Sequence, residues 1–166
     1  MFYLDLFRAL DEAQVRYVLV GGLALNVHGV ERATMDVDIA IALDPVNLRQ
    51  TVAALRSLGL QPVAPVGWDE VLRPGQLERW YDEKHMLALG VRKTGGFDPT
   101  VDVLTRTSVP FDSLYANRIV KMVDGMPVSI VSIDDLIALK TGTGRKIDAS
   151  DVQALKTLKK IQSEQK

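Results

Sequence analysis

The chain has 166 residues, with 20 lysines and arginines, 21 aspartates and glutamates, and no cysteine. The formal net charge of −1 excludes a global electrostatic field that would recruit nucleic acid or an anionic membrane, so any RNA contact has to be local. The lack of cysteine excludes disulfides and thiolate metal sites, which fits a reducing cytoplasm.

The N-terminal residues lack the features of a signal peptide or a membrane span, because charged side chains interrupt them early and no long apolar run follows. Leu4, Phe7 and Leu10 recur at helical spacing, which predicts an amphipathic helix over residues 2–14 that packs on a sheet. We expect a soluble cytoplasmic protein without membrane contact. The length predicts one domain over residues 1–166.

A diglycine follows the first predicted strand. Residues 17–20 are apolar and indicate a buried strand, and Gly21 and Gly22 connect it to a short helix that begins at Leu23. Glycine lets a backbone approach a ligand closely, and a helix N-terminus presents free N–H groups and a partial positive charge. The turn therefore suits a phosphate group. The bland alternative is that the glycines only permit tight packing of strand on helix.

Two aspartates, Asp36 and Asp38, occupy alternate positions of the next predicted strand and must point to the same face. Two like charges about 6 Å apart repel by roughly 2 to 3 kcal/mol at an effective dielectric near 20, unless a cation compensates them. A divalent metal, Mg²⁺ or Mn²⁺, is the natural candidate, because hard cations prefer carboxylate oxygens. The alternative is a solvated strand end.

The middle of the chain predicts a helix, a loop and two strands. Asp44-Pro45 begins the helix and Gly59 ends it. Prolines and glycines break the pattern over residues 61–76, which we expect to be a lid or substrate loop. Residues 85–91 and 100–104 alternate and predict two neighbouring strands.

Asp102 lies between Val101 and Val103 in the second of these strands, so it faces away from both valines. If the valines face the core, Asp102 joins Asp36 and Asp38. The alternative is an aspartate that pairs with a buried arginine.

The C-terminal third predicts a peripheral hairpin over residues 117–131, turning at Asp124-Gly125. C-terminal helices follow from about residue 133, and the last starts near Asp148, which we expect to cap it. Strands and helices in this order predict an α/β, or α+β, fold in which helices pack on a mixed sheet.

Taken together, the diglycine, the spacer and the Asp-x-Asp strand resemble the pattern of the nucleotidyltransferase superfamily related to DNA polymerase beta. Arg32 and Thr34, just before the aspartates, make the pattern most similar to the abortive-infection and toxin–antitoxin type nucleotidyltransferases. Other stretches that fit this group are Glu78-Arg79-Trp80, VDVLT, and DDLIALK followed by GRKIDASDVQAL.

The resemblance implies a polymerase-beta-like fold and a Mg²⁺-dependent transfer of a nucleoside monophosphate from an NTP such as ATP to an acceptor hydroxyl. The acceptor would be RNA, a protein or a small molecule, and a toxin or antitoxin protein is a possible partner. The implied catalytic residues and metal ligands are Asp36, Asp38 and Asp102. The implied nucleotide- and phosphate-binding residues are Gly21, Gly22, Arg32, Thr34 and Lys140.

Each of these assignments has a structural alternative. Thr34 would bind phosphate or cap the turn, and Arg32 would neutralise triphosphate or lie in solvent. Trp68 and Trp80 would stack on a base or, as we favour, seal the edge of the core. At the level of the whole protein, the alternative to an enzyme is a non-catalytic protein-binding module of a toxin–antitoxin pair.

Overall fold

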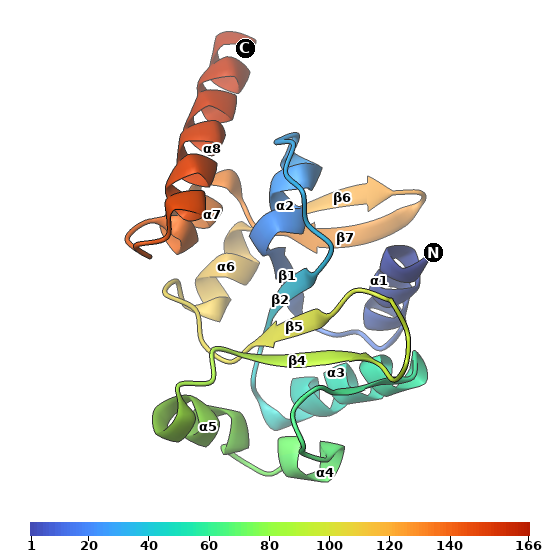
Figure 1. Ribbon diagram of the computed structural model, residues 1–166. Helices are drawn as coiled ribbons and strands as arrows, with labels where there is room; N and C mark the ends of the chain where they lie inside the picture. Colours follow the sequence, from blue (N-terminus) through green and yellow to red (C-terminus); the bar gives the residue numbers. More distant parts are fainter.

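A computed structural model describes all residues, 1–166, as helices packed on one mixed sheet (Figure 1). The helices are α1 (Phe2–Glu12), α2 (Gly21–His28), α3 (Pro45–Ser57), α4 (Trp68–Val71), α5 (Gln76–Lys84), α6 (Phe111–Asn117), α7 (Ile133–Lys140) and α8 (Lys146–Glu164). The strands are β1 (Tyr17–Val20), β2 (Val37–Ile41), β3 (Leu60–Pro62), β4 (Ala88–Lys93), β5 (Val101–Leu104), β6 (Ile119–Val123) and β7 (Met126–Ile130).

The seven strands lie in the order β3-β4-β5-β2-β1-β7-β6. The β2–β5 and β1–β7 pairs are parallel, and the other pairs are antiparallel. The predicted mixed sheet with packed helices is therefore confirmed.

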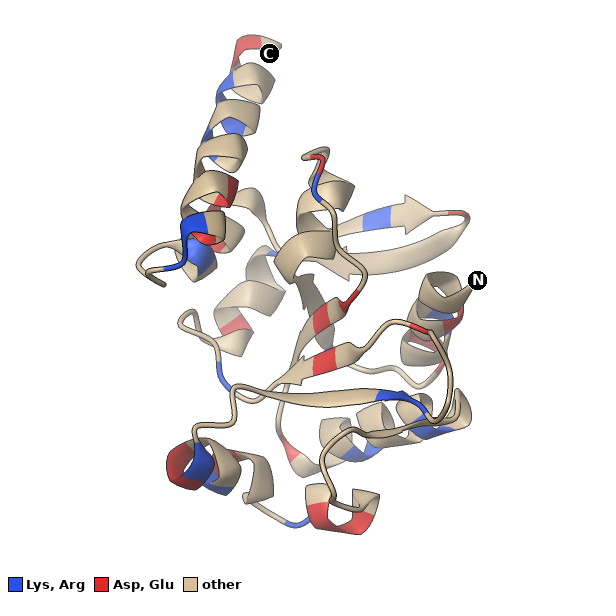
Figure 2. Cartoon of the chain, in the orientation of Figure 1, with Lys and Arg blue, Asp and Glu red and all other residues tan.

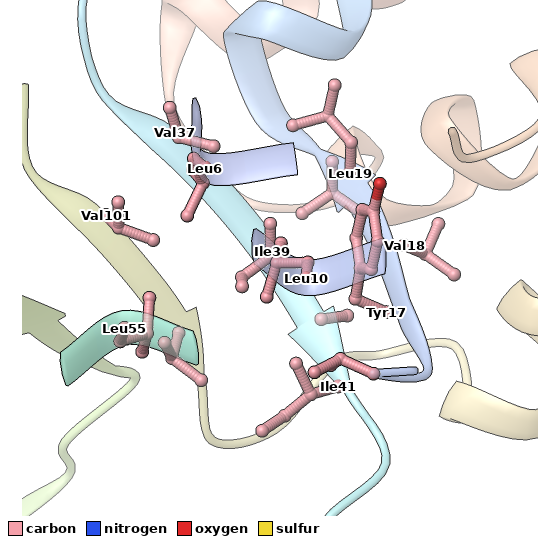
Figure 3. Close-up of a cluster of buried hydrophobic side chains, with 14 of the residues drawn as sticks. Leu6, Leu10, Tyr17, Val18, Leu19, Val37, Ile39, Ile41, Leu55 and Val101 are labelled. Carbon is pink, nitrogen blue, oxygen red and sulfur yellow. The ribbon is translucent and has the colours of Figure 1, made fainter. Parts of the chain in front are cut away.

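The core lies on the sheet face that α1 and α3 cover. Alternate residues of the central strands, including Leu19, Ile39 and Val101, are fully buried there with Leu6 and Leu10 of α1 (Figure 3). Fully burying one leucine stabilises the fold by about 1.5 to 3 kcal/mol, so the periodic apolar face of α1 fixes that helix on the sheet.

The start of α3 follows its sequence signals. Asp44 is the N-cap, and its Oδ1 accepts a hydrogen bond of 3.0 Å from the backbone N–H of Asn47. Pro45 occupies the first turn, and Gly59 follows the helix with a φ of 75°. These local rules are those by which the helix was predicted.

Several element boundaries differ from the prediction. Strand β2 begins at Val37, so Asp36 lies just before it. Helix α2 begins at Gly21 itself rather than at Leu23, and α8 begins at Lys146. His85 ends α5 with a φ of 52°, and the strand predicted from it begins only at Ala88.

The C-terminal hairpin is not peripheral. Strands β6 and β7 pair as predicted, but β7 also pairs with β1 through Leu19 and Ile130, so it extends the main sheet. Helix α6, which precedes the hairpin, was not predicted. None of the helices combines the length and the apolar character that crossing a bilayer requires.

Candidate active site

Asp38 and Asp102 lie side by side on neighbouring strands. Strands β2 and β5 run parallel in a register that pairs Asp38 with Asp102, and Val101 and Val103 are buried on the opposite face. The acidic segments of β2 and β5 lie next to each other in Figure 2. Strand alternation thus places Asp102 beside Asp38, on the face of the sheet opposite to its flanking valines.

These carboxylates lack a counter-charge in direct contact. Burial raises the pKa of Asp38 to about 6, and repulsion from Asp102 and then Asp36 adds to the effect, while Lys140 and Arg145 oppose it. Burial and the charge of Asp36 also raise the pKa of Asp102. Neither Asp38 nor Asp102 forms an ion pair, so the alternative in which Asp102 pairs with an arginine is wrong.

Asp36 stands at the rim of this group. Its side chain is exposed, and its Oδ1 accepts a hydrogen bond of 3.1 Å from the backbone N–H of Thr100. The backbone N–H of Val37 donates to the carbonyl of Thr100 at 2.9 Å. These two bonds fix the entry to β2 against the entry to β5, and so fix the carboxylates relative to each other.

The diglycine has a steric explanation at both positions. Gly21 has a φ of 70°, and a Cβ there would overlap Oδ2 of Asp38. A Cβ on Gly22 would lie 2.9 Å from Oγ1 of Thr34. Gly21 therefore lets the Asp38 carboxylate lie against the start of α2, and Gly22 lets Thr34 pack there.

The N-terminus of α2 lies against the carboxylate of Asp38. No side chain caps it, so N–H groups of its first turn have no side-chain acceptor. The half-buried Thr34 beside it donates no hydrogen bond within the chain and does not cap the turn.

A second group of charged residues, which we call the ion network, comprises Arg32, Lys140, Arg145, Asp148 and Asp151. Oδ2 of Asp151 accepts from Arg32 at 2.8 Å and from Lys140 Nζ at 3.0 Å. Lys140 also donates to Oδ1 of Asp148 at 3.2 Å. The Lys140 side chain is only 8% exposed, so its ammonium group is held between two carboxylates rather than presented to the cleft.

Arg145 forms the exposed end of the ion network. It donates to Asp148 from Nε at 2.6 Å and from a terminal nitrogen at 3.1 Å, while its side chain stays 69% exposed. Burial alone would raise the pKa of Asp148, but hydrogen bonds from Arg145, Thr143 and Lys140 lower it to about 2. Asp148 therefore anchors three donors, and the prediction that it caps α8 is wrong, since Arg145 is the N-cap residue.

Arg32 is neither in solvent nor free. It pairs with Asp151, its Nε is buried without a partner, and one of its terminal nitrogens lies 3.4 Å from where a Cβ of Gly22 would be. The ion network thus reaches the diglycine. In sequence, the only sign of Arg145 and Asp151 was their place in the stretch GRKIDASD, where basic residues precede acidic ones.

A family of proteins described as nucleotidyltransferase of unknown function (DUF6036) matches residues 4–165. The chain belongs to this nucleotidyltransferase family. A search of curated proteins finds no match.

Solved structures of nucleotidyltransferases share the fold. The lincosamide antibiotic adenylyltransferase LnuA, bound to lincomycin, has a TM-score of 0.56 at 14% identity and covers 90% of each chain. ANT(2")-Ia, in complex with adenylyl-2"-tobramycin, has a TM-score of 0.57 at 13% identity, covering 92% of this chain and 84% of its own. An antigenic nucleotidyltransferase-like protein from Paracoccidioides brasiliensis has a TM-score of 0.55 at 18% identity, covering 92% and 71%. The predicted polymerase-beta-like nucleotidyltransferase fold is confirmed.

The carboxylates of this nucleotidyltransferase fit a metal only in part. No group of three or more His, Cys, Asp or Glu side chains is gathered as a metal-binding set, so the predicted set of Asp36, Asp38 and Asp102 is not assembled from protein atoms alone. Mg²⁺ usually takes one or two carboxylates and completes its octahedron with substrate phosphates and water. Two adjacent carboxylates without counter-ions fit that mode of binding.

Trp68, Trp80 and His28 are structural residues. Trp68 and Trp80 are buried in the core cluster, so neither presents a face for stacking on a base. The ring of His28 is buried, and its Nε2 lies 2.7 Å from the carbonyl oxygen of Val131. Burial lowers the pKa of His28, which fits a neutral packing residue.

Proposed function

We propose that the protein transfers a nucleoside monophosphate from an NTP to an acceptor hydroxyl and releases pyrophosphate. The observation that carries this proposal is the pair Asp38 and Asp102, which have raised pKa values and no ion-pair partner, beside the uncapped start of α2. An unpaired anionic site next to free N–H groups suits a cation and a phosphate bound together.

The chemistry assigns a role to each carboxylate. Asp102 accepts the proton of the acceptor hydroxyl, whose oxygen forms a bond to the α-phosphorus. The bond from that phosphorus to the oxygen bridging the β-phosphate breaks, and pyrophosphate leaves. Asp36 and Asp38, with Asp102, would hold Mg²⁺ or Mn²⁺, which would neutralise charge on the attacking and leaving oxygens.

The proposed phosphate contacts lie on the other side of Asp38 from Asp102. Backbone N–H groups at Gly21 and Gly22 would bind phosphate oxygens, together with the free hydroxyl of Thr34. Arg145 is the exposed cation of the ion network and would contact the phosphates directly. Lys140 and Arg32 are held by aspartates, so they would add positive electrostatic potential without contacting the phosphates.

The fold neighbours and the sequence resemblance suggest different acceptors. LnuA and ANT(2")-Ia are structures with lincomycin and an adenylylated tobramycin, which favours ATP as donor and a small-molecule acceptor. The resemblance to toxin–antitoxin nucleotidyltransferases adds RNA and proteins to small molecules as acceptor classes, and suggests a toxin or antitoxin protein as partner. A non-catalytic binding module is disfavoured, because unpaired carboxylates with raised pKa values serve no purpose in it.

Thermal unfolding with each of the four NTPs and Mg²⁺ tests the proposal. A ligand that binds only the folded state raises the melting temperature, so one Mg-NTP should stabilise the wild type. The double variant Asp36→Asn, Asp38→Asn should fold and lose that stabilisation. If the double variant is stabilised as much as the wild type, the assignment is wrong.

A further inference from the structure

The carboxylates divide their face of the sheet into two chemically different sides. On one side lies the ion network, which reaches the start of α2 beside Asp38 through Arg32. On the other side lies β4, where Gly90 pairs in register with Asp102, and Ala88 pairs with Leu104. One side is cationic, and the other is uncharged around Asp102.

Gly90 keeps the uncharged side of Asp102 open. A Cβ at this position would lie 3.2 Å from Oδ1 of Asp102 and 3.8 Å from Cγ2 of Val63. Gly90 does not have a positive φ, so its backbone conformation does not require glycine. The space beside the Asp102 carboxylate does, because any side chain would crowd the carboxylate from the β4 side.

A pocket of about 260 Å³ lies at the C-terminal ends of β2 and β5. It is lined by Ala40 and Leu104, which follow Asp38 and Asp102 by two residues and so share their face, about 7 Å further along the strands. Phe111, at the start of α6, also lines it, and Arg106 is the one charged residue in its lining. An apolar cavity of about 150 Å³ holds a benzene molecule, so this pocket has room for a substituted ring.

The geometry of phosphoryl transfer indicates which of the two substrates binds on the Gly90 side of Asp102. Attacking and leaving oxygens stand roughly in line across the phosphorus. The leaving pyrophosphate is drawn to the cations of the ion network, so the acceptor hydroxyl has to arrive from the side of Asp102 and Gly90. An acceptor there meets an apolar floor with one arginine at its edge, whereas RNA binding requires several cations along the phosphate backbone.

We propose that the acceptor is a small hydroxyl compound with an apolar ring, which lies over β5 with its hydroxyl at Asp102 and its ring in the pocket between Leu104 and Phe111. This proposal rests on the proposed nucleotidyl transfer and adds the acceptor's position and chemical class. Gly90 and Ala40 then determine which acceptors fit, without taking part in the chemistry.

Ligand-observed NMR with 2-phenylethanol as the probe tests the pocket without requiring turnover. Saturation should transfer from the wild type to the probe. The substitution Ala40→Leu fills the pocket and should weaken the probe's signal by about tenfold. The matched control Ala53→Leu adds the same side chain on the exposed face of α3 and should leave the signal unchanged. If Ala40→Leu does not fold, Leu104→Phe fills the pocket from the neighbouring strand and should have the same effect.

A second measurement separates this proposal from the proposed function. Ala40→Leu should raise KM for aryl alcohols in label transfer from α-phosphate-labelled ATP, while the thermal stabilisation by Mg-ATP stays as in the wild type. Equal probe binding by the wild type and the filled variants would overturn the acceptor site, and so would transfer of label to an RNA oligonucleotide or a protein in preference to aryl alcohols. Neither result affects Mg-NTP binding, whose absence in the wild type would instead refute the nucleotidyl transfer itself.

Discussion

Two groups of aspartates in this protein experience opposite electrostatics. The pKa of Asp38, among the carboxylates, is raised to about 6, whereas that of Asp148, in the ion network, is lowered to about 2. Asp148 is the more deeply buried of the two, so burial does not decide the difference. The difference in pKa comes from the cations that are hydrogen-bonded to Asp148. The aspartates of the ion network are paired with cations of the same chain, whereas Asp38 and Asp102 keep their charge for a ligand from outside.

The largest expected effect follows from removing the proposed base. Asp102→Asn keeps the shape of the side chain but cannot accept a proton, so turnover should fall by roughly 10² to 10⁴. Thermal stabilisation by Mg-NTP should change much less. The measurements are label transfer from α-phosphate-labelled NTP and melting with Mg-NTP. Asp98→Asn, which removes a surface carboxylate paired with Lys93, serves as the control. Undiminished transfer by a folded Asp102→Asn variant would contradict the assignment.

Breaking the ion network should lower the free energy of unfolding. Asp151→Asn removes the charge that holds Arg32 and Lys140, and breaking a buried pair in this way costs about 3 to 5 kcal/mol. Urea denaturation measures the loss. Asp134→Asn breaks only the exposed pair with Lys159 and should cost less than about 1 kcal/mol. A loss for Asp151→Asn as small as that of this control would show that the ion network is not a stabilising unit.

The pH dependence of stability distinguishes the two groups by sign. Because the folded pKa of Asp148 is depressed from 3.8 to about 2, its ionised form stabilises the fold above about pH 4, and this contribution is lost as the pH falls towards 2. The contribution is of the order of 2 kcal/mol. Urea midpoints between pH 5 and pH 2 should therefore fall less steeply for Asp148→Asn than for the wild type, about its own lower starting value. Parallel curves would exclude Asp148 as the titrating group.

The smallest expected effect concerns Asp38, whose contribution to stability changes with pH in the opposite direction to that of Asp148. The folded pKa of Asp38 is raised from 3.8 to about 6, so the fold is favoured by its protonated form below about pH 4, and that advantage is lost as the pH rises through 6. Without metal, Asp38→Asn should be more stable than the wild type at pH 7. The full pKa shift is worth about 3 kcal/mol, and solvent screening of the half-buried side chain reduces the expected gain to about 1 kcal/mol, which disappears near pH 4. Denaturation at these two pH values in the presence of a chelator checks it. A variant less stable than the wild type at pH 7 would mean that Asp38 is a structural residue.

The sequence predicted those features that depend on near neighbours. Alternation along β5 placed Asp102 on the face of Asp38, and Asp44-Pro45 marked the start of α3. It did not reveal the ion network, because Arg32 and Asp151 are 119 residues apart and only the folded chain brings the segment between α2 and β2 to α8. The resemblance implied Lys140 as a phosphate ligand, whereas the packing of α8 on α7 buries its ammonium group between Asp148 and Asp151.

The shared contact of Arg32 and Lys140 with Asp151 makes the last helix part of the site's architecture. Asp148 and Asp151 both belong to α8, so both anions of the ion network lie on one helix, while two of its cations, Arg32 and Lys140, come from other segments of the chain. The chain therefore completes its site only after its final helix has been made and docked. A shorter chain that stopped before α8 would carry Arg32, Lys140 and Arg145 with nothing to hold them beside Asp38.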